Sequence, residues 1–338
     1  MSGIMMMVIA IVVLGGAYLL YGRYLQNKWG IDPKAKTPAY EMEDGVDYVP
    51  ADTNVVFGHQ FASIAGAGPI NGPIQAAIFG WLPVLLWILI GGVFFGAVQD
   101  FASMYASVKN KGRTIGYIIE AYIGKLGKKL FLLFCWLFCI LVVAAFADVV
   151  AGTFNGFATN DAGEVTKVVA NGAVATTSML FIFEAVGLGF FLKYTKFNKW
   201  VNTAFAIVLL VAAIVLGLQF PMYVSLGTWH IIIFVYILIA SVAPVWALLQ
   251  PRDYLNSYLL IFMIVGAVIG VFAANPACNL QAFTSFNVDG QYMFPILFVT
   301  IACGAVSGFH SLVSSGTASK QIKNEKNMLP VSFGAMLM

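Results

Sequence analysis

The chain has 338 residues, of which 60% are hydrophobic and only 10% are charged, and its mean hydropathy is +0.87. Soluble globular domains carry about 25% charged residues, so the composition argues against a soluble enzyme, a nucleic-acid-binding protein and a disulfide-rich secreted domain. It indicates a multi-pass membrane protein. The net charge is only +3, and the four cysteines do not form the pattern of a disulfide framework.

Nine apolar runs are long enough to be transmembrane helices, because about 20 apolar residues cross the hydrocarbon layer. They cover residues 4–22, 57–79, 82–108, 130–154, 174–192, 198–219, 228–249, 255–274 and 293–312. The first run lacks the basic start and the cleavage site of a signal peptide, so it is predicted to be a retained helix. The predicted fold is an all-α polytopic membrane protein.

The basic residues divide unevenly between the two predicted sides of the membrane. One side holds four in 23–56, six in 109–129, three in 193–199, one at 252 and three in 320–326, whereas the other holds only Lys167. The positive-inside rule makes the rich side cytoplasmic and places the N-terminus outside. Segment 113–129 has apolar residues at helical spacing and predicts an amphipathic helix on the inner membrane surface, or else a loop helix packed on the bundle.

The second apolar run is interrupted at Gly66–Pro73, where three glycines and two prolines weaken a helix. We expect two half-helices, the second beginning near 70–71; a simple proline kink is the alternative. A helix that begins inside the membrane offers unpaired N–H groups and a positive dipole end to a substrate carboxylate. The substrate-binding candidates here are Gly66, Gly68, Pro69, Asn71 and Gly72.

The seventh run carries Pro244, lies five runs after the second and crosses in the opposite direction. Interrupted helices at these two places are typical of two inverted five-helix repeats. Residues 1–338 are therefore predicted to form one membrane-embedded domain, with an extra helix at 4–22, a first repeat at 57–219 and a partial second repeat at 228–338. Another apolar run starts just before Met338, so we expect a C-terminally truncated gene or a fragment.

Three acidic residues, Asp100, Asp148 and Glu184, fall within apolar runs, where an ionisable group indicates an ion or proton pathway. With His59, at the start of the second run, they are the candidates for proton or cation coupling. Structural hydrogen bonds are the alternative for Glu184 and His59, and lining a cytoplasmic vestibule is the alternative for Asp100.

Segment 308–317 is rich in hydroxyl groups and ends an apolar run. His310, Ser314 and Ser315 are candidates for binding a polar substrate or a hard cation such as Na⁺, and a capped helix end is the alternative. The chain has no phosphate-binding loop and no metalloenzyme motif, so we expect no enzyme activity, no metal and no cofactor.

The segments that carry these features are similar to one known family. They are VFGHQFASIAGAGPINGP at 56–73, GAVQDF at 96–101, PVWALLQPRDYL at 244–255, GFHSLVSSGT at 308–317 and SKQ at 319–321. The chain resembles the carbon starvation protein A family of bacterial inner-membrane transporters. The resemblance implies uptake of peptides or pyruvate during carbon starvation, the inverted repeats of the amino acid–polyamine–organocation superfamily, and coupling to a cation gradient.

The sequence thus favours a secondary active transporter in the bacterial inner membrane, importing peptides or pyruvate and coupled to H⁺. Its expected partners are a small carboxylate substrate, H⁺ or Na⁺, and the lipid bilayer, with no nucleic acid. A channel or a starvation-linked membrane sensor without transport is the alternative.

Overall fold

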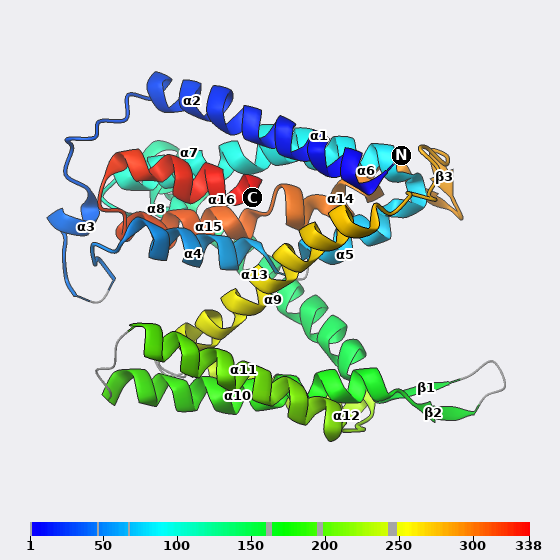
Figure 1. Cartoon of the computed structure of the whole chain (residues 1–338). Coiled ribbons are helices and arrows are strands. Elements are labelled where there is room, and N and C mark those ends of the chain that lie inside the picture. The colour runs from blue at the N-terminus through cyan, green and yellow to red at the C-terminus, as the bar shows by residue number, and fades with distance from the viewer. Residues whose placement is uncertain (1, 46, 67, 160–163, 195–198, 243–248) are drawn as a thin grey trace. The chain divides into compact units, whose positions relative to one another are not determined.

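The computed structural model describes residues 2–45, 47–66, 68–159, 164–194, 199–242 and 249–338. The chain forms two compact units (Figure 1): unit 1 comprises Met1–Leu130 and Met263–Met338, and unit 2 comprises Phe131–Phe262. Within the described residues, five helices have the length and apolarity of membrane spans: Gly3–Lys28, Trp81–Lys109, Lys125–Phe154, Val169–Leu188 and Met293–Lys320. The fold is therefore that of a helical membrane protein, and the nine crossings stay a prediction.

Two long helices of unit 1 each contain a short π-helical segment. The first consists of α1 (Gly3–Gly16), η1 (Ala17–Gly22) and α2 (Arg23–Lys28), and Ser2 caps its start by accepting a hydrogen bond from the Met5 N–H. The second consists of α6 (Trp81–Gly91), η3 (Gly92–Ala97) and α7 (Val98–Lys109). These helices cover the predicted runs 4–22 and 82–108.

The second apolar run is two helices, as predicted. Helix α4 (Thr53–Ile64) ends where Ala65 leaves the helical region, and α5 (Gly68–Ala76) follows and continues into η2 (Ala77–Phe79). The expected start near 70–71 is wrong by about one turn. Helix α5 begins at Gly68 because a proline in the first turn, Pro69, lacks only an N–H that would have no helical partner.

The predicted run 293–312 lies within the candidate span Met293–Lys320, but it consists of two helices rather than one. Helix α14 (Met293–Ala305) ends at Val306, whose φ is −149°, and α15 (Gly308–Gly316) begins after Ser307. The Ser307 hydroxyl accepts a hydrogen bond from the Phe309 N–H at 3.2 Å, so this serine is an N-cap that starts a new helix. The hairpin β3 (Asn287–Val288) and β4 (Gln291–Tyr292) precedes α14.

The C-terminal segment completes the core of unit 1. Short helices η4 (Ala318–Lys320) and η5 (Glu325–Asn327) lead to η6 (Leu329–Gly334) and α16 (Ala335–Leu337). Phe333 of η6 is fully buried against Phe101 of α7, with 6.3 Å between the ring centroids. A second core lies between α5, η2, α6 and α14, around Phe79 and Leu297.

The helix predicted over 113–129 is wrong in extent. Helix α8 covers only Ile115–Tyr122, and the basic residues from Lys125 onward begin α9 (Lys125–Phe154). Gly124 separates the two helices with φ +109°, a backbone conformation that favours glycine. Within this segment, Lys128 donates a hydrogen bond to the Glu120 carboxylate, and that bond lowers the pKa of the Glu120 carboxyl.

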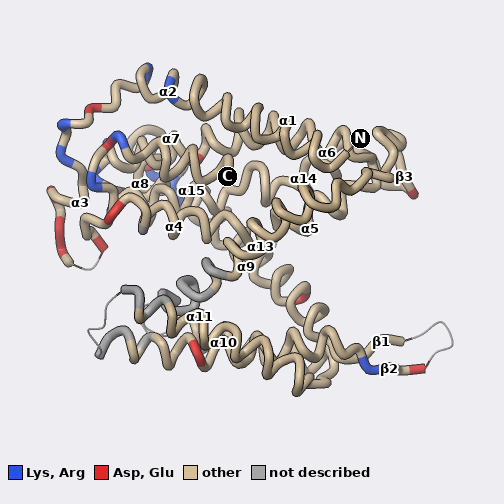
Figure 2. Tube along the Cα trace, in the orientation of Figure 1, with Lys and Arg blue, Asp and Glu red and all other residues tan. Residues whose placement is uncertain are grey.

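Charged residues gather at the end of unit 1 that holds α3 (Pro38–Glu41) and the end of α2 (Figure 2). Three loops far apart in sequence meet there. Ala51 pairs with Ile322, and the Tyr48 hydroxyl donates to the Lys111 carbonyl at 3.1 Å. The opposite end is marked by the Gly3 N–H, which donates to the Pro276 carbonyl at 2.8 Å. The basic segments 23–56, 109–129 and 320–326 therefore share one end of unit 1, as the charge pattern predicts.

Ion pairs join these loops. Lys109 contacts Glu325 at 2.7 Å, Lys320 contacts Asp47 at 3.2 Å and Lys323 contacts Asp52 at 2.5 Å. The hydrogen bond to Asp52 raises the pKa of the Lys323 ammonium. Glu325 also accepts a hydrogen bond from the Asp32 N–H at 3.0 Å and is 2% exposed, so it is the buried member of this group.

Unit 2 consists mainly of long apolar helices: most of α9, α10 (Val169–Tyr194), α11 (Lys199–Gln219), α12 (Leu226–Val242) and the first part of α13 (Leu249–Ala274). The hairpin β1 (Phe157–Thr159) and β2 (Val165–Lys167) joins α9 to α10. Trp229 of α12 is fully buried against Phe154 of α9. Gly217 of α11 lies against Thr177 of α10, where a Cβ would be only 1.9 Å from the threonine hydroxyl.

The buried ion pair at the charged end of unit 1 predicts a stability difference. Glu325→Gln weakens the bonds to Lys109 and Asp32, and we expect it to lower the free energy of unfolding by about 1.5–3 kcal/mol, the range for a hydrogen bond to a charged group. Asp47→Asn is the control, because Asp47 is 63% exposed and exposed pairs contribute about 0–1 kcal/mol. Thermal unfolding in detergent measures both variants. Equal losses of stability would contradict the assignment of Glu325 as the buried member of this group.

Candidate functional site

Unit 1 contains two interrupted helices that pack side by side in opposite directions: α4–α5 and α14–α15, here called the interrupted pair (Figure 1). Before the first interruption, the Gln60 side-chain N–H donates to the His310 carbonyl at 3.3 Å. After it, Gly68 lies against Cys303 and Gly72 against Thr300. The contacts run antiparallel, so the interruption between α4 and α5 faces the one between α14 and α15.

Glycines allow this close approach. A Cβ on Gly72 would lie 2.5 Å from the Thr300 carbonyl oxygen, and one on Gly304 would lie 2.9 Å from Pro69 Cα. Both obstacles are backbone, which cannot move aside as a flexible side chain can. Glycine is therefore needed at these positions because the two backbones touch.

Helix α7 is held against the interrupted pair in the same way. A Cβ on Gly96, in η3, would lie 2.1 Å from the Ala305 carbonyl oxygen at the end of α14. This contact places Gln99 and Asp100 beside α15, where Gln99 donates to the Ser311 hydroxyl at 3.1 Å and Ser314 donates to the Asp100 carbonyl at 2.9 Å. A π-helical segment often occurs at a functional site.

Six polar residues from three helices form a cluster beside the interruptions, called the polar cluster: Gln60 of α4, Gln99 and Asp100 of α7, and His310, Ser311 and Ser314 of α15. Gln60 and Ser314 are fully buried, and Asp100 and His310 are 1% and 2% exposed. Burial of polar groups is costly unless each finds a partner. The cluster is therefore a polar region buried between apolar helices.

Three atoms of the polar cluster are buried and have no hydrogen-bond partner among the described residues. They are Gln60 Oε1, Asp100 Oδ2 and His310 Nδ1. Most buried polar atoms in native proteins are bonded to protein or to water. Unsatisfied groups at this site indicate a place where a further polar ligand or a proton binds. Within the described residues, no group of three or more His, Cys, Asp or Glu side chains is arranged to hold a metal ion.

The helix directions give the interruptions a mixed electrostatic character. Helices α5 and α15 begin there, at Gly68 and Gly308, and helices α4 and α14 end there, at Ile64 and Ala305. Helix starts favour anions and helix ends favour cations. One place in unit 1 can thus stabilise both a carboxylate and a cation.

The chain as a whole matches the family model described as "Carbon starvation protein CstA" over residues 2–338. The chain belongs to the CstA family. It is 36% identical to the peptide transporter CstA of Escherichia coli K12, over 95% of this chain and 46% of that protein, and 36% identical to the peptide transporter CstA of Bacillus subtilis 168, over 100% and 56%. It is also 36% identical to the pyruvate/proton symporter BtsT of E. coli K12, over 100% and 47%.

The chain spans about half the length of the curated relatives it matches. No solved structure is significantly similar to it. Membership of the CstA family, together with the apolar helices, makes the protein a multi-pass protein of the bacterial inner membrane.

The structure brings some of the predicted site residues of this CstA family member together and separates others. His310, Ser314 and Asp100 meet in the polar cluster, and Asp100 is buried rather than lining an open vestibule. Gly68, Pro69 and Gly72 are packed against α14. Two further candidates lie on or beside α5: Gly66 is exposed at the interruption and Asn71 is half-buried.

Other predicted residues lie elsewhere in unit 1 or outside the described residues. The Ser315 carbonyl accepts hydrogen bonds from the hydroxyls of Ser107 and Ser319, both at 2.7 Å, so Ser315 belongs to the contact between α15 and α7. His59 is half-buried on α4, and its carbonyl accepts from Ser63 at 2.8 Å. Pro244 lies outside the described residues.

The two remaining acids belong to unit 2. Asp148 of α9 is 3.0 Å from His230 Nε2 of α12, and both side chains are exposed, at 76% and 41%. Glu184 of α10 has one buried oxygen, Oε2, without a partner among the described residues. Asp148 and Glu184 therefore belong to unit 2, whereas the polar cluster belongs to unit 1.

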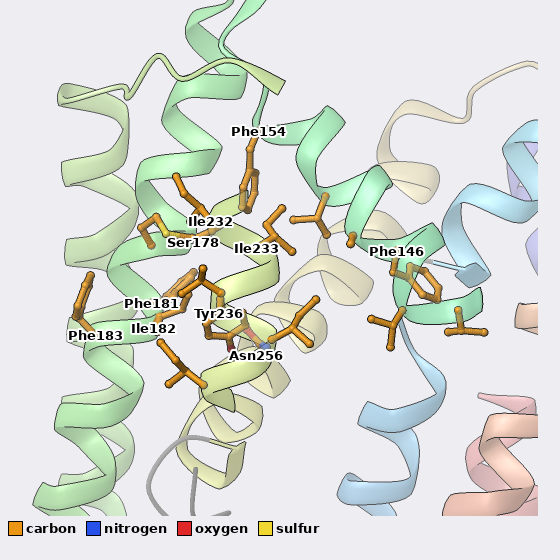
Figure 3. A pocket seen from close by; sticks show the side chains of 18 residues that line it. Phe146, Phe154, Ser178, Phe181, Ile182, Phe183, Ile232, Ile233, Tyr236 and Asn256 are labelled. Carbon is orange, nitrogen blue, oxygen red and sulfur yellow. The ribbon is translucent and has the colours of Figure 1, made fainter. Parts of the chain in front are cut away.

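Unit 2 also contains an apolar pocket of about 740 Å³ between α9, α10, α12 and the start of α13 (Figure 3). Its lining is mainly Phe, Ile and Val side chains, with Ser178, Tyr236 and Asn256 as the polar members. A surface of this kind lacks the charges and paired donors that bind a carboxylate. The interrupted pair in unit 1 is therefore the better candidate site.

Sequence reasoning missed Gln60, Gln99, Ser311 and His230. Gln60 and Gln99 are adjacent in sequence to His59 and Asp100, which were predicted as coupling candidates. Neighbouring residues on a helix point about 100° apart, so which of a pair faces the interior depends on packing. The missed signal for the second interruption is the Ser307–Gly308 pair, which resembles a helix N-cap inside an apolar run.

The packing of the interrupted pair predicts the effect of adding one methyl group. Gly72→Ala pushes a Cβ against the Thr300 carbonyl, and we expect it to destabilise the protein by about 1–3 kcal/mol, as overpacking does. Gly58→Ala, on α4, is the control, because nothing lies within 4 Å of its Cβ position and alanine favours a helix. Thermal unfolding in detergent measures both; if Gly72→Ala is as stable as Gly58→Ala, α5 and α14 do not touch as described.

Proposed function

We propose that this protein imports peptides or pyruvate across the bacterial inner membrane by secondary active transport coupled to a proton gradient. One observation carries the proposal: the interruptions of two antiparallel helices face each other beside a buried polar cluster. Membrane proteins keep irregular backbone at depth only inside protein or beside a water-filled cavity. Transporters use such interruptions to hold a substrate and its coupling ion.

A carboxylate is the substrate group that the geometry supports. Both α5 and α15 start at the interruptions, and a helix start attracts an anion. Two relatives are named as peptide transporters and one as a pyruvate/proton symporter, and a peptide and pyruvate each carry a carboxylate. We propose that Gly66, Gly68, Pro69, Asn71 and Gly72 form one wall of this site. His310, Ser314 and Ser315 complete the proposed set within unit 1, and the predicted candidate Pro244 lies outside the described residues.

The packing refines the roles of the glycines. Gly68 and Gly72 lie against α14, so they act by allowing close approach of the two helices. Gly66 is exposed beside the interruption and is the position at which a substrate reaches backbone. Asn71 is half-buried and supplies a side-chain amide on the same helix.

The wider architecture is part of the same proposal. We propose nine crossings with the N-terminus outside, in one membrane domain built from a repeat at 57–219 and its inverted counterpart within 228–338. The shared charged end of unit 1 supports the orientation, since the positive-inside rule makes that end cytoplasmic. His59, Asp148 and Glu184 remain proposed coupling residues in addition to Asp100, with Na⁺ as the alternative ion.

Uptake by proteoliposomes that contain the 338-residue chain tests the function. With an inward proton gradient, we expect saturable, uphill uptake of labelled pyruvate or a labelled dipeptide, with competition between the two if one site serves both. Flux that is downhill and does not saturate would indicate a channel. Substrate binding without flux would indicate a sensor.

A matched pair of serine variants tests the site. Ser311→Ala removes the acceptor for Gln99, and we expect the KM for uptake to rise about fivefold, the effect of losing a hydrogen bond of about 1 kcal/mol. Ser332→Ala is the control, because among the described residues this buried serine bonds within its own helical turn, to the Met328 carbonyl. Equal KM values for the two variants would remove the polar cluster from the transport site.

A further inference from the structure

Two of the three unsatisfied atoms of the polar cluster, Gln60 Oε1 and Asp100 Oδ2, are explained by one missing proton. The Gln60 amide has a fixed orientation, because its Nε2 donates to the His310 carbonyl at 3.3 Å and the flipped amide would place two acceptors against each other. Gln60 Oε1 is therefore an acceptor, and it is buried without a donor among the described residues.

Asp100 is the neighbour that can supply the donor. Gln60 bonds to the His310 carbonyl, and the Asp100 carbonyl bonds to Ser314, one turn further along α15, so the two residues meet the same face of that helix. Asp100 Oδ2 is buried without a partner among the described residues. An ionised carboxylate has only acceptors, whereas a protonated one has an O–H that donates. A proton on Asp100 thus provides a donor beside an acceptor that lacks one and neutralises a charge that burial disfavours.

The titratable groups on the elements packed against α7 do not provide a permanent positive charge that could stabilise an ionised Asp100. Helix α4 carries His59 and α15 carries His310, whose Nδ1 is itself unsatisfied. Lys320 of η4 is paired with Asp47, and Glu120 of α8 is paired with Lys128. Elements η3 and η6 have no titratable side chain. The nearest lysine on α7, Lys109, is paired with Glu325.

We propose that Asp100 is the proton-binding residue of the transporter, with its proton shared with Gln60, and that His310 is the positioning residue that orients Gln60. This inference rests on the proposed function and names the residue that couples it to protons. Release breaks the Asp100 O–H bond, transfers the proton to water and leaves a carboxylate. A carboxylate buried between α4, α7 and α15 is unfavourable, so release requires water or a change in these helices. That requirement links proton movement to access at the interruptions.

Infrared spectroscopy of the full chain in lipid tests proton binding without any transport. We expect a carbonyl-stretch band of a protonated carboxyl that disappears in Asp100→Asn and persists in the control Glu120→Gln, whose carboxylate is on α8 and paired with Lys128. In Gln60→Leu, which removes the acceptor, the band is expected to shift to the position of a carboxyl without a hydrogen bond. This second variant serves as the test if Asp100→Asn does not fold.

Transport in proteoliposomes gives the second readout. In Asp100→Asn, uphill uptake driven by a proton gradient is expected to be lost, and the control Glu120→Gln is expected to keep it. The inference is overturned if the band is unchanged in Asp100→Asn, if Na⁺ removes it at constant pH, or if Asp100→Asn keeps uptake driven by the proton gradient. Loss of the band in a chain without any transport would keep the proton site and refute the proposed function.

Discussion

The structure of unit 1 depends on the direct contact between two interrupted helices. Glycines at 68, 72 and 304 remove the side chains that would keep α5 and α14 apart. Because the contact is antiparallel, it brings both interruptions to the same place. The backbone groups left unpaired at four helix ends therefore gather in one polar region inside an apolar protein. A site of this kind is a property of the pair, since one interrupted helix alone would supply only half of it.

The polar cluster follows from that contact. Gly96 touches the end of α14, which sets α7 beside α15 and buries Asp100 among groups from three helices. At the far end of α7, Lys109 pairs with Glu325, so the same helix also anchors the charged loops. Helix α7 thus connects the interruptions to the end of unit 1 where the basic residues gather (Figure 2). The carbon starvation family match extends over both regions.

Hydropathy and residue type predict only part of this arrangement. The first interruption was predictable, because prolines and glycines concentrate at 66–73 and act locally. The second was not, because the apolar run continues through Val306 and only a single serine cap marks the break. Asp100 and His310 were identifiable as polar residues at membrane depth, but their neighbours Gln60 and Gln99 were not, since helix rotation decides which residue is buried. The Lys109–Glu325 pair joins residues 216 positions apart, and no local pattern encodes such a contact.

Disulfide cross-linking in membranes tests most directly whether the two interruptions face each other. In a chain whose four native cysteines are replaced, Gly66→Cys combined with Ser307→Cys places one thiol at each interruption. Mild oxidation is predicted to join this pair, and Gly58→Cys combined with Ser307→Cys, about two turns away along α4, is predicted to stay unjoined. Cross-linking of the distant pair without cross-linking of the facing pair would contradict the antiparallel contact on which the proposed site depends.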